Sequence, residues 1–479
     1  MRSAGLVRSY NSSGGDHMKR FDLNIEKVLE DWGVRHALRE VIANALDEQA
    51  LTRTRDVDIF KDEQGRWHIR DFGRGLKYEH LTQNEDQEKQ SRPDLVVGKF
   101  GVGLKDALAT FDRRKIKVLM KSRHCDITTA KSSKHGFEDI ATLHAVIDDA
   151  SEPNIVGTDC VLERVTDAEM AAAKDFFLRF SGDDPIENTQ YGQVLDKGGR
   201  KVARIYITGL RVAEEENFLC SYNITSVNAA IRKALNRERT NVGRTAYTER
   251  VKAILLDCKE QRIAQLLVGD LKNYEMGTSH DELAWIDVQV HACKLLNATS
   301  KVIFLTSADL ITAKDMVDRA TKDGYAVVTI PASVKYKIHG LTDSQGDPMR
   351  DLEAYATEWN DSFQFQFVTE SDLTKSERAI FNQTDSIFKL IGGKPKTIKQ
   401  VLISKTMRTA TIGYREADGV WEPGTQRIII KRDRLTGIHA YSSTLLHETA
   451  HATSGAGDVS EVFEQELTRL IGAITEESL

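Results

Sequence analysis

Cysteine is scarce in this chain of 479 residues: there are 5 cysteines, no two of them in a CxxC spacing. A disulfide framework and a cysteine-based zinc site are both disfavoured, and we expect free thiols in a reducing cytoplasm. Long apolar runs are also missing, so neither a membrane-spanning helix nor a signal peptide is predicted. Excess positive charge is absent too, because the net charge is −6, and general affinity for nucleic acid or membranes is not expected.

Hydrophobic content of 40% and only 7 prolines suit compact globular domains, and the length predicts two to four of them. Residues 1–17 are polar and rich in serine and glycine, so they resemble a tag or a disordered leader and are left out of the fold prediction. The chemically informative patterns lie at the two ends of the remaining chain.

Near the C-terminus, His447, Glu448 and His451 form an HExxH pattern. Residues four apart share a helix face, so the two imidazoles can hold one metal ion. Glu448 lies beside them, placed to take a proton from water. The alternative is a chance grouping of two histidines and a glutamate on an ordinary helix.

We expect Ser442 and Ser443 to cap this helix and the glycine-rich segment 454–457 to end it. A zinc hydrolase needs a third protein ligand, and four acids follow: Asp458, Glu461, Glu464 and Glu466. Glu464 is the first choice because it stands next to the apolar stripe of the next helix, and Glu461 is the second; a solvated surface acid is the alternative for each. Residues 350–479 resemble the HExxH zinc peptidases of the gluzincin kind, whose third ligand is a glutamate on a following helix. The resemblance implies Zn²⁺ and a zincin-like α+β domain over residues 346–479.

Four separated motifs occupy the N-terminal third: Glu40 with Asn44 one helical turn later, an Asp-Phe-Gly-Arg-Gly run at 71–75, a glycine-rich stretch at 98–105, and Gly-Thr at 157–158. An acid and an amide on one helix face can orient water and coordinate Mg²⁺. An aspartate before a glycine turn can accept a hydrogen bond from an adenine amino group. A glycine-rich loop that opens a helix offers N–H groups to phosphates. Each motif alone is often only a turn or a solvated face, but their order makes coincidence a poor explanation.

Together these motifs resemble the GHKL superfamily, which includes gyrase, the heat-shock chaperone ATPases, histidine kinases and MutL. Over residues 18–185 the resemblance implies a Bergerat-type α/β sandwich that binds ATP and Mg²⁺. It implies that Glu40 activates water, Asn44 holds Mg²⁺ and Asp71 reads adenine. The other implied cofactor-binding positions are Asp47, Gly73, Gly75, Gly98, Gly101, Gly103, Lys105 and Thr158.

The branch of the superfamily is indicated by Glu40, because histidine kinases lack this glutamate. The chain is therefore similar to the ATPase branch, and its Gly103-Leu104-Lys105 run resembles the MORC type. Glu48 departs from the family, which usually has a small residue at that position.

Residues 186–345 are predicted to form a transducer-like α/β region, as the resemblance implies. Segment 201–212 is strand-like, and residues 301–330 show a strand, a helix and a strand. In GHKL proteins a basic residue of this region reaches the γ-phosphate. The candidates are Arg237, Arg239 and Arg244, and a solvated basic helix face is an equal alternative for each.

The whole chain is thus expected to be an α+β multidomain protein in which ATP binding closes a lid over residues 77–103, favours a homodimer and gates a zinc peptidase. A protein substrate or an activating partner and a role in bacterial defence or stress response are further expectations. Two alternatives remain open: an ATP-driven DNA clamp or remodeller, and a chaperone-like clamp, each with a non-catalytic HExxH helix. Salt-dependent DNA binding, zinc content and peptide cleavage discriminate among them.

Overall fold

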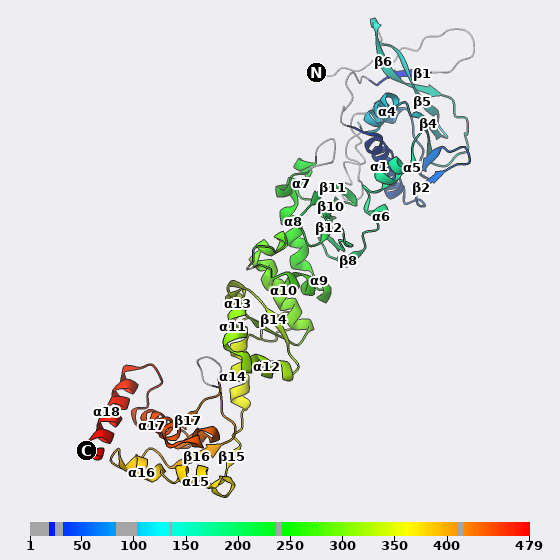
Figure 1. Cartoon of the computed structure of the whole chain (residues 1–479). Helices are drawn as coiled ribbons and strands as arrows, with labels where there is room; N and C mark the ends of the chain where they lie inside the picture. Colours follow the sequence, from blue (N-terminus) through cyan, green and yellow to red (C-terminus); the bar gives the residue numbers. More distant parts are fainter. Residues whose placement is uncertain are drawn as a thin grey trace. The chain divides into compact units, whose positions relative to one another are not determined.

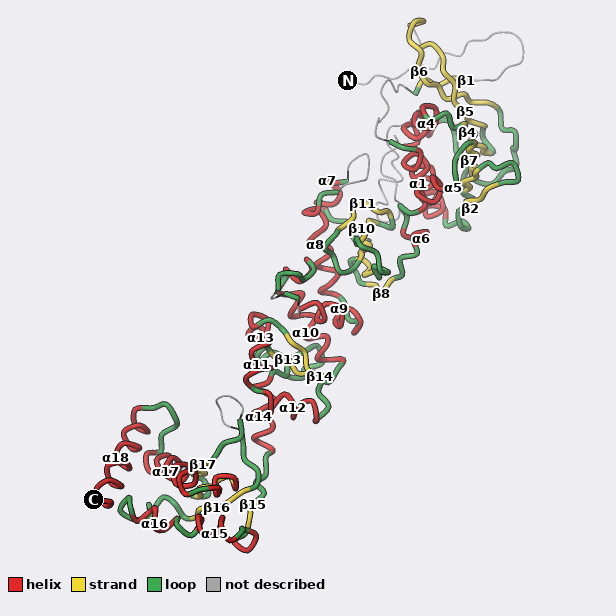
Figure 2. The backbone as a smooth tube through the Cα atoms, viewed as in Figure 1, coloured by secondary structure: helices red, strands yellow, loops and turns green. Residues whose placement is uncertain are grey.

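The computed structural model of the chain describes residues 19–23, 32–82, 103–134, 137–235, 242–271, 273–274, 276–409 and 415–479. These residues form a mixed α/β structure with four sheets, as Figures 1 and 2 show. The chain divides into two compact units, Met1–Leu267 with His280–Val288 and Val268–Ser279 with Gln289–Leu479. At this level the predicted α+β multidomain class is confirmed. Among the described helices, none has both the length and the apolar character that crossing a membrane requires.

The first sheet has the strand order β1-β6-β5-β4-β7-β3-β2, and each neighbouring pair is antiparallel. Its strands are β1 (Lys19–Asp22), β2 (Asp58–Lys61), β3 (Trp67–Arg70), β4 (Lys117–Ser122), β5 (Asp126–Lys134), β6 (Phe137–Asp148) and β7 (Thr158–Glu163).

Helices cover one face of this sheet (Figure 1): α1 (Val34–Thr52), α4 (Gly103–Arg113) and α5 (Asp167–Lys174), with the short α2 (Glu79–Thr82) preceding α4. In α1, Val34, Leu38, Val41 and Ile42 recur at helical spacing and are buried in one core with the strands. This packing places one face of α1 against α4, where two of the predicted motifs meet.

The second sheet has the order β11-β10-β12-β9-β8, with β10 and β12 parallel and the other neighbours antiparallel. Its strands are β8 (Pro185–Asn188), β9 (Gly192–Leu195), β10 (Ala203–Ile207), β11 (Leu210–Glu215) and β12 (Ser221–Ile224). The predicted strand at 201–212 is a hairpin, because Thr208 and Gly209 have φ values of 48° and 83° and turn the chain. The helices nearby in sequence are α6 (Leu178–Ser181), α7 (Ala229–Ala234), α8 (Arg244–Asp257), α9 (Gln261–Leu271) and the 3₁₀ helix η1 (Asp281–Ala284).

The second unit contains the predicted strand, helix and strand, observed as β13 (Val302–Leu305), α12 (Lys314–Lys322) and β14 (Ala326–Thr329), with the two strands parallel. Around them lie α11 (Ser307–Thr312), α13 (Ala332–Ile338) and α14 (Leu352–Ser362). The boundary between the two units falls inside α10 (Ile286–Thr299), so the predicted region 186–345 is shared between the units.

The last sheet has the order β15-β16-β18-β17, formed by β15 (Phe367–Val368), β16 (Gln400–Ser404), β17 (Gly419–Glu422) and β18 (Arg427–Lys431). Its companions are α15 (Lys375–Phe381), α16 (Thr384–Lys389), α17 (Ile438–Ser454), α18 (Glu461–Ser478), η2 (Glu370–Asp372) and η3 (Arg432–Thr436). The core is apolar and includes the fully buried Ile428, Ile430, Tyr441 and Leu445. Strand β17 is an edge strand, and α17 packs against it.

Candidate active sites

The N-terminal acid Glu40 is buried on α1, with 3% of its surface exposed. Its Oε1 accepts hydrogen bonds from Nη2 of Arg39 at 2.8 Å and from Nε at 3.1 Å. Asn44, one turn later, is half-buried, and Asp47 is fully buried on the same helix. A buried carboxylate held by a guanidinium has one defined orientation, which a group that activates water requires.

Helix α4 begins directly beside the Glu40 carboxylate. A Cβ added at Gly103, the first described residue of α4, would overlap Oε2 of Glu40 and lie 3.1 Å from its Cδ. Lys105, which follows Leu104 in the first turn of α4, is buried, and burial lowers the pKa of its ammonium group. The structure therefore brings the first and third motifs together. Gly98 and Gly101, and most of the predicted lid, lie outside the described residues.

The second and fourth motifs also meet. The backbone N–H of Asp71 donates to the Thr158 carbonyl at 3.0 Å, and the N–H of Leu76 donates to the Thr158 hydroxyl at 2.9 Å. The N–H of Gly73 donates to Oδ1 of Asp71 at 2.9 Å. Gly157 has φ of 80°, and a Cβ there would lie 2.6 Å from the Asp71 carbonyl carbon. Burial raises the pKa of Asp71 to about 6, so its carboxylate is ionised and able to accept a hydrogen bond at neutral pH.

Glu48, where the GHKL resemblance leads us to expect a small residue, supports the glycine turn of the second motif. Its Oε2 pairs with Nη2 of Arg74 at 2.8 Å, and its Oε1 accepts from the Arg74 backbone N–H at 2.8 Å. A Cβ at Gly73 would lie 2.8 Å from the Glu48 Cδ, so a larger residue there would require the Glu48 side chain to shift. Gly75, with φ of 85°, makes the turn toward Gly157.

Of the three basic candidates for the γ-phosphate, Arg237 and Arg239 lie outside the described residues. Arg244 pairs with Asp281 at 2.5 Å and approaches Glu215 at 3.7 Å. Its guanidinium carbon also lies 4.7 Å from the centroid of the Phe218 ring. The positive charge of Arg244 is thus balanced by acids next to the second sheet.

The HExxH helix α17 begins earlier than predicted. It starts at Ile438 after Gly437, and the hydroxyls of Ser442 and Ser443 donate to the His439 carbonyl at 3.3 and 2.6 Å. The prediction that these serines cap the helix is wrong, because four residues before them already have helical geometry. The predicted end is confirmed: Gly455 terminates the helix in the left-handed region, with φ of 67°.

Three donor atoms converge at the C-terminal site. Nε2 of His447 and Nε2 of His451 lie 3.2 Å apart, and Oδ1 of Asp458 lies 3.2 and 3.1 Å from them. The carboxylate that meets the histidines is thus Asp458, whereas Glu464 and Glu461 are exposed on α18 and outside this group. The reason is the rotation of α18, which turns Phe463 toward the histidines, with ring centroids 5.0 and 4.3 Å apart.

The protonation of His451 suits metal binding. Its Nδ1 lies 2.8 Å from the carbonyl oxygen of Ala456, which only accepts, so Nδ1 carries the proton and Nε2 keeps its lone pair. Burial, followed by the neighbouring His451, lowers the pKa of His447. The lowered pKa favours the neutral form of His447, which a metal ligand needs.

Glu448 is buried between α17 and the edge strand β17. Burial raises the pKa of its carboxyl to about 7, while a hydrogen bond from the Trp421 backbone opposes this rise. A Cβ at Gly419 would lie 2.8 Å from Cγ of Glu448 and 3.0 Å from Oε1, so glycine permits the strand to approach the acid. These residues line a cavity of about 1540 Å³ that also contains His447, His451 and Asp458.

Three contributors were missed or ranked too low from sequence. Asp458 was one of four acids, and its separation from His451 by only six residues that include a glycine turn was the available signal. The role of Arg39 can be inferred from its position beside Glu40 only once the helix is known to be buried. Gly419 carried no recognisable signal, because its role depends on the distance between a strand and a helix.

Comparisons with known proteins concern several parts of the chain. Residues 168–261 match the family model described as the Mycoplasma pneumoniae MPN635 N-terminal domain. An uncharacterized protein of Mycoplasma pneumoniae is 33% identical over 244 residues, which are 50% of this chain and 97% of that protein. A second uncharacterized protein of the same organism is 22% identical over 361 residues, covering 67% of this chain and 96% of that protein. The residues 168–261 include all five strands of the second sheet.

Proposed function

The chain belongs to the same protein family as an uncharacterized protein of Mycoplasma pneumoniae, and for this chain we propose a zinc-dependent peptidase that also binds and hydrolyses ATP. The observation that carries the peptidase assignment is the group formed by His447, His451 and Asp458. Tetrahedral zinc with bonds of about 2.0–2.1 Å separates its ligand atoms by about 3.3–3.4 Å. The three donor atoms are 3.1 to 3.2 Å apart, so the residues fit this ion.

The exposure of the group supports a catalytic over a closed structural site. The side chains of His447 and Asp458 are 43% and 60% exposed, whereas that of His451 is 15% exposed. Solvent therefore reaches one side of the group, where a substrate can approach. His447, His451 and Asp458 would hold Zn²⁺ there, and the ion would supply a Lewis acid that lowers the pKa of water and polarises a carbonyl.

Glu448 is the proposed general base. It is not one of the three donors, its carboxyl is buried, and it lies on the cavity wall beside them. In peptide hydrolysis it takes the proton of the attacking water and gives it to the leaving amine. Positioning by the Trp421 backbone and by the close approach of Gly419 keeps it under β17.

The edge strand β17 favours a peptide substrate. It pairs with β18 along one side, and Gly419, Val420 and Trp421 line the cavity. Extended peptides add to the open edge of a sheet through main-chain hydrogen bonds. A peptide bound in this way would pass in front of Glu448 and the three donors.

The test of the peptidase assignment is metal analysis combined with cleavage. Asp458→Ala is expected to lose zinc and Glu464→Ala to retain about one zinc per chain, as the matched acid that lies outside the group. Glu448→Gln should keep zinc and lose cleavage, because this residue only moves a proton; loss of a general base typically costs about 10²–10⁴-fold. Iron in place of zinc in the purified protein, or zinc loss in Glu464→Ala with retention in Asp458→Ala, would contradict this assignment.

The ATPase assignment is supported by the meeting of the four N-terminal motifs in pairs, Glu40 with Gly103 and Asp71 with Thr158. In this proposal ATP and Mg²⁺ bind over α1, Asn44 holds Mg²⁺, Asp71 accepts from the adenine amino group, and Glu40 activates water. A GHKL-type sandwich and a zincin-like domain are part of the same proposal. Glu40→Ala should still bind ATP and lose hydrolysis, and ATP turnover at the unaltered rate would refute the role of Glu40. A chaperone-like or DNA clamp becomes the better account if purified protein holds no metal and cleaves nothing.

A further inference from the structure

Phe176 connects the surroundings of Glu40 with the second sheet. The guanidinium carbon of Arg39 lies 5.4 Å from the centroid of the Phe176 ring, and that of Arg211 lies 5.1 Å from the same centroid. The backbone N–H of Arg211 also donates to the Phe176 carbonyl at 2.8 Å. Phe176 is buried, with 7% of its surface exposed. One ring thus contacts a residue of α1 and a residue of β11.

On the α1 side, Arg39 has little freedom to turn. It is 1% exposed, and its guanidinium lies over the Trp32 ring as well as the Phe176 ring, at 5.4 Å from each centroid. The same guanidinium donates twice to Oε1 of Glu40. A shift of the Phe176 ring therefore moves Arg39, and with it the oxygen of Glu40 that Arg39 holds.

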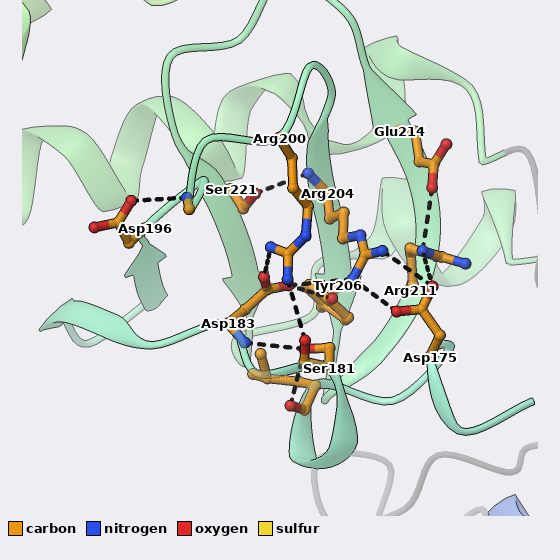
Figure 3. Close-up of polar contacts among 12 residues, drawn as sticks. Asp175, Ser181, Asp183, Asp196, Arg200, Arg204, Tyr206, Arg211, Glu214 and Ser221 are labelled. Atoms are coloured by element: carbon orange, nitrogen blue, oxygen red, sulfur yellow. Dashed lines mark hydrogen bonds and ion pairs between the residues drawn. The ribbon is translucent and has the colours of Figure 1, made fainter. Parts of the chain in front are cut away.

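On the β11 side, Arg211 is fixed by acids (Figure 3). Its Nη1 lies 2.8 Å from Oδ2 of Asp175 and 3.1 Å from Oε1 of Glu214. Asp175 also accepts from Nη2 of Arg204 on β10 at 3.0 Å. Asp175, which precedes Phe176, thus pairs with arginines on two strands of the second sheet.

The segment after Phe176 is tied to the same sheet. Asp183, whose side chain is fully buried, pairs with Arg200 and accepts from the Tyr206 hydroxyl at 2.5 Å. The backbone N–H of Leu178 donates to the Gly209 carbonyl at 2.8 Å. The connection between α5 and β8 therefore contacts the second sheet at both of its ends. Because Phe176 lies in this connection, a movement of β11 would also move Phe176.

We propose that Phe176 and Arg211 are positioning residues for ATP hydrolysis, which transmit the position of the second sheet to Glu40 through Arg39. The inference rests on the proposed ATPase function and adds to it the residues by which the second sheet controls the base. Because these residues act on the orientation of Glu40, their loss affects turnover and leaves nucleotide affinity unchanged.

The test uses the full chain and measures kcat and KM for ATP hydrolysis together with ADP binding. Arg211→Met removes the charge from the Phe176 ring and keeps the length of the side chain. We expect a loss in kcat of about 3- to 30-fold, the range found for residues that modulate coupling, with KM and ADP binding within about twofold of the original values. Arg211→Lys, which keeps the charge, should restore part of the rate. Arg179→Met is the matched control, since Arg179 lies on the same connection and pairs with Asp56 and Gln49.

Double variants separate this relay from a general loss of structure. In the Arg39→Lys background, which keeps the charge of residue 39 but loses its planar fork, Arg211→Met should reduce kcat by less than about twofold more. Phe176→Leu provides the same comparison if Arg211→Met does not fold. Equal rates for Arg211→Met and Arg179→Met, or full multiplication of the two losses in the double variant, would overturn the inference. Unaltered hydrolysis by Glu40→Ala would instead refute the role of Glu40, and absence of ATP hydrolysis by the unaltered chain would remove the proposed function itself.

Discussion

Replacing Gly103 with alanine should disable ATP hydrolysis without unfolding the helix that carries it. Alanine is a better helix former than glycine by about 1 kcal/mol, so α4 itself does not suffer. The added methyl would overlap Oε2 of Glu40 and lie 3.1 Å from Cδ. Both helices are fixed by buried packing of Ala107, Leu108 and Ile42, so the carboxylate must retreat by about 1 Å to reach van der Waals contact.

A misplacement of about 1 Å at a reacting group can cost about 10²-fold in rate, or about 2.7 kcal/mol in the barrier. We therefore expect Gly103→Ala to lower kcat by about 10²-fold, close to the lower end of what complete loss of the base costs. Phosphate release at saturating ATP measures the rate, and binding of a fluorescent ADP analogue verifies that the site still loads. Gly269→Ala is the matched control, because this glycine is also within a helix and an added Cβ meets nothing within 4 Å.

The decisive comparison is a double-mutant cycle. In Glu40→Ala the atoms that meet the new methyl are gone, so Gly103→Ala should cost nothing further, and the coupling free energy should equal the whole effect of the single change. Unaltered turnover in Gly103→Ala, or an additional loss in the Glu40→Ala background, would refute the reasoning that the two residues act at one place.

Three other outcomes can be measured on the same protein. Because burial raises the pKa of Asp71 to about 6, its carboxylate loses the ability to accept a hydrogen bond as pH falls through that value. ATP affinity should therefore be constant above about pH 7 and fall about tenfold per pH unit below about pH 5. Asp71→Asn should bind ATP weakly at every pH, and a pH titration of ATP affinity with no inflection would contradict the adenine role. Gly157→Ala should lower the melting temperature and abolish nucleotide binding, because φ of 80° costs a non-glycine residue about 1–2 kcal/mol and the added Cβ would meet the Asp71 carbonyl. Gly182→Ala is the control: φ is 70° there, and an added Cβ meets nothing within 4 Å, so only the backbone cost should appear. If ATP gates the peptidase, a non-hydrolysable analogue should change the cleavage rate and Asn44→Ala should abolish that change while zinc is retained; equal rates with no nucleotide, ADP and analogue would leave two independent activities.

Local patterns were sufficient for much of the secondary structure. Strand β3 consists of Trp67–Arg70, directly before the second motif, and Thr374 forms a capping box with Glu377 at the start of α15. The strand, helix and strand within 301–330 follow from apolar periodicity. These features depend on residues that are near neighbours in the chain, so a single sequence determines them. The start of α17 was missed because glycine at position 437 gives no capping side chain to read.

The sequence was enough to identify most of the candidate site residues. Which other residues they contact depends on the tertiary structure. HExxH spacing alone places His447 and His451 on one helix face, because helical geometry is local. Which acid completes the group was decided by the rotation of α18, which turns Phe463 toward the histidines and leaves Asp458 on the preceding turn to reach them. In the same way, the contact of Gly103 with Glu40 and the path from Arg39 through Phe176 to Arg211 join residues far apart in the chain. Such contacts arise when helices and sheets pack, and no local pattern encodes the distance between two packed elements.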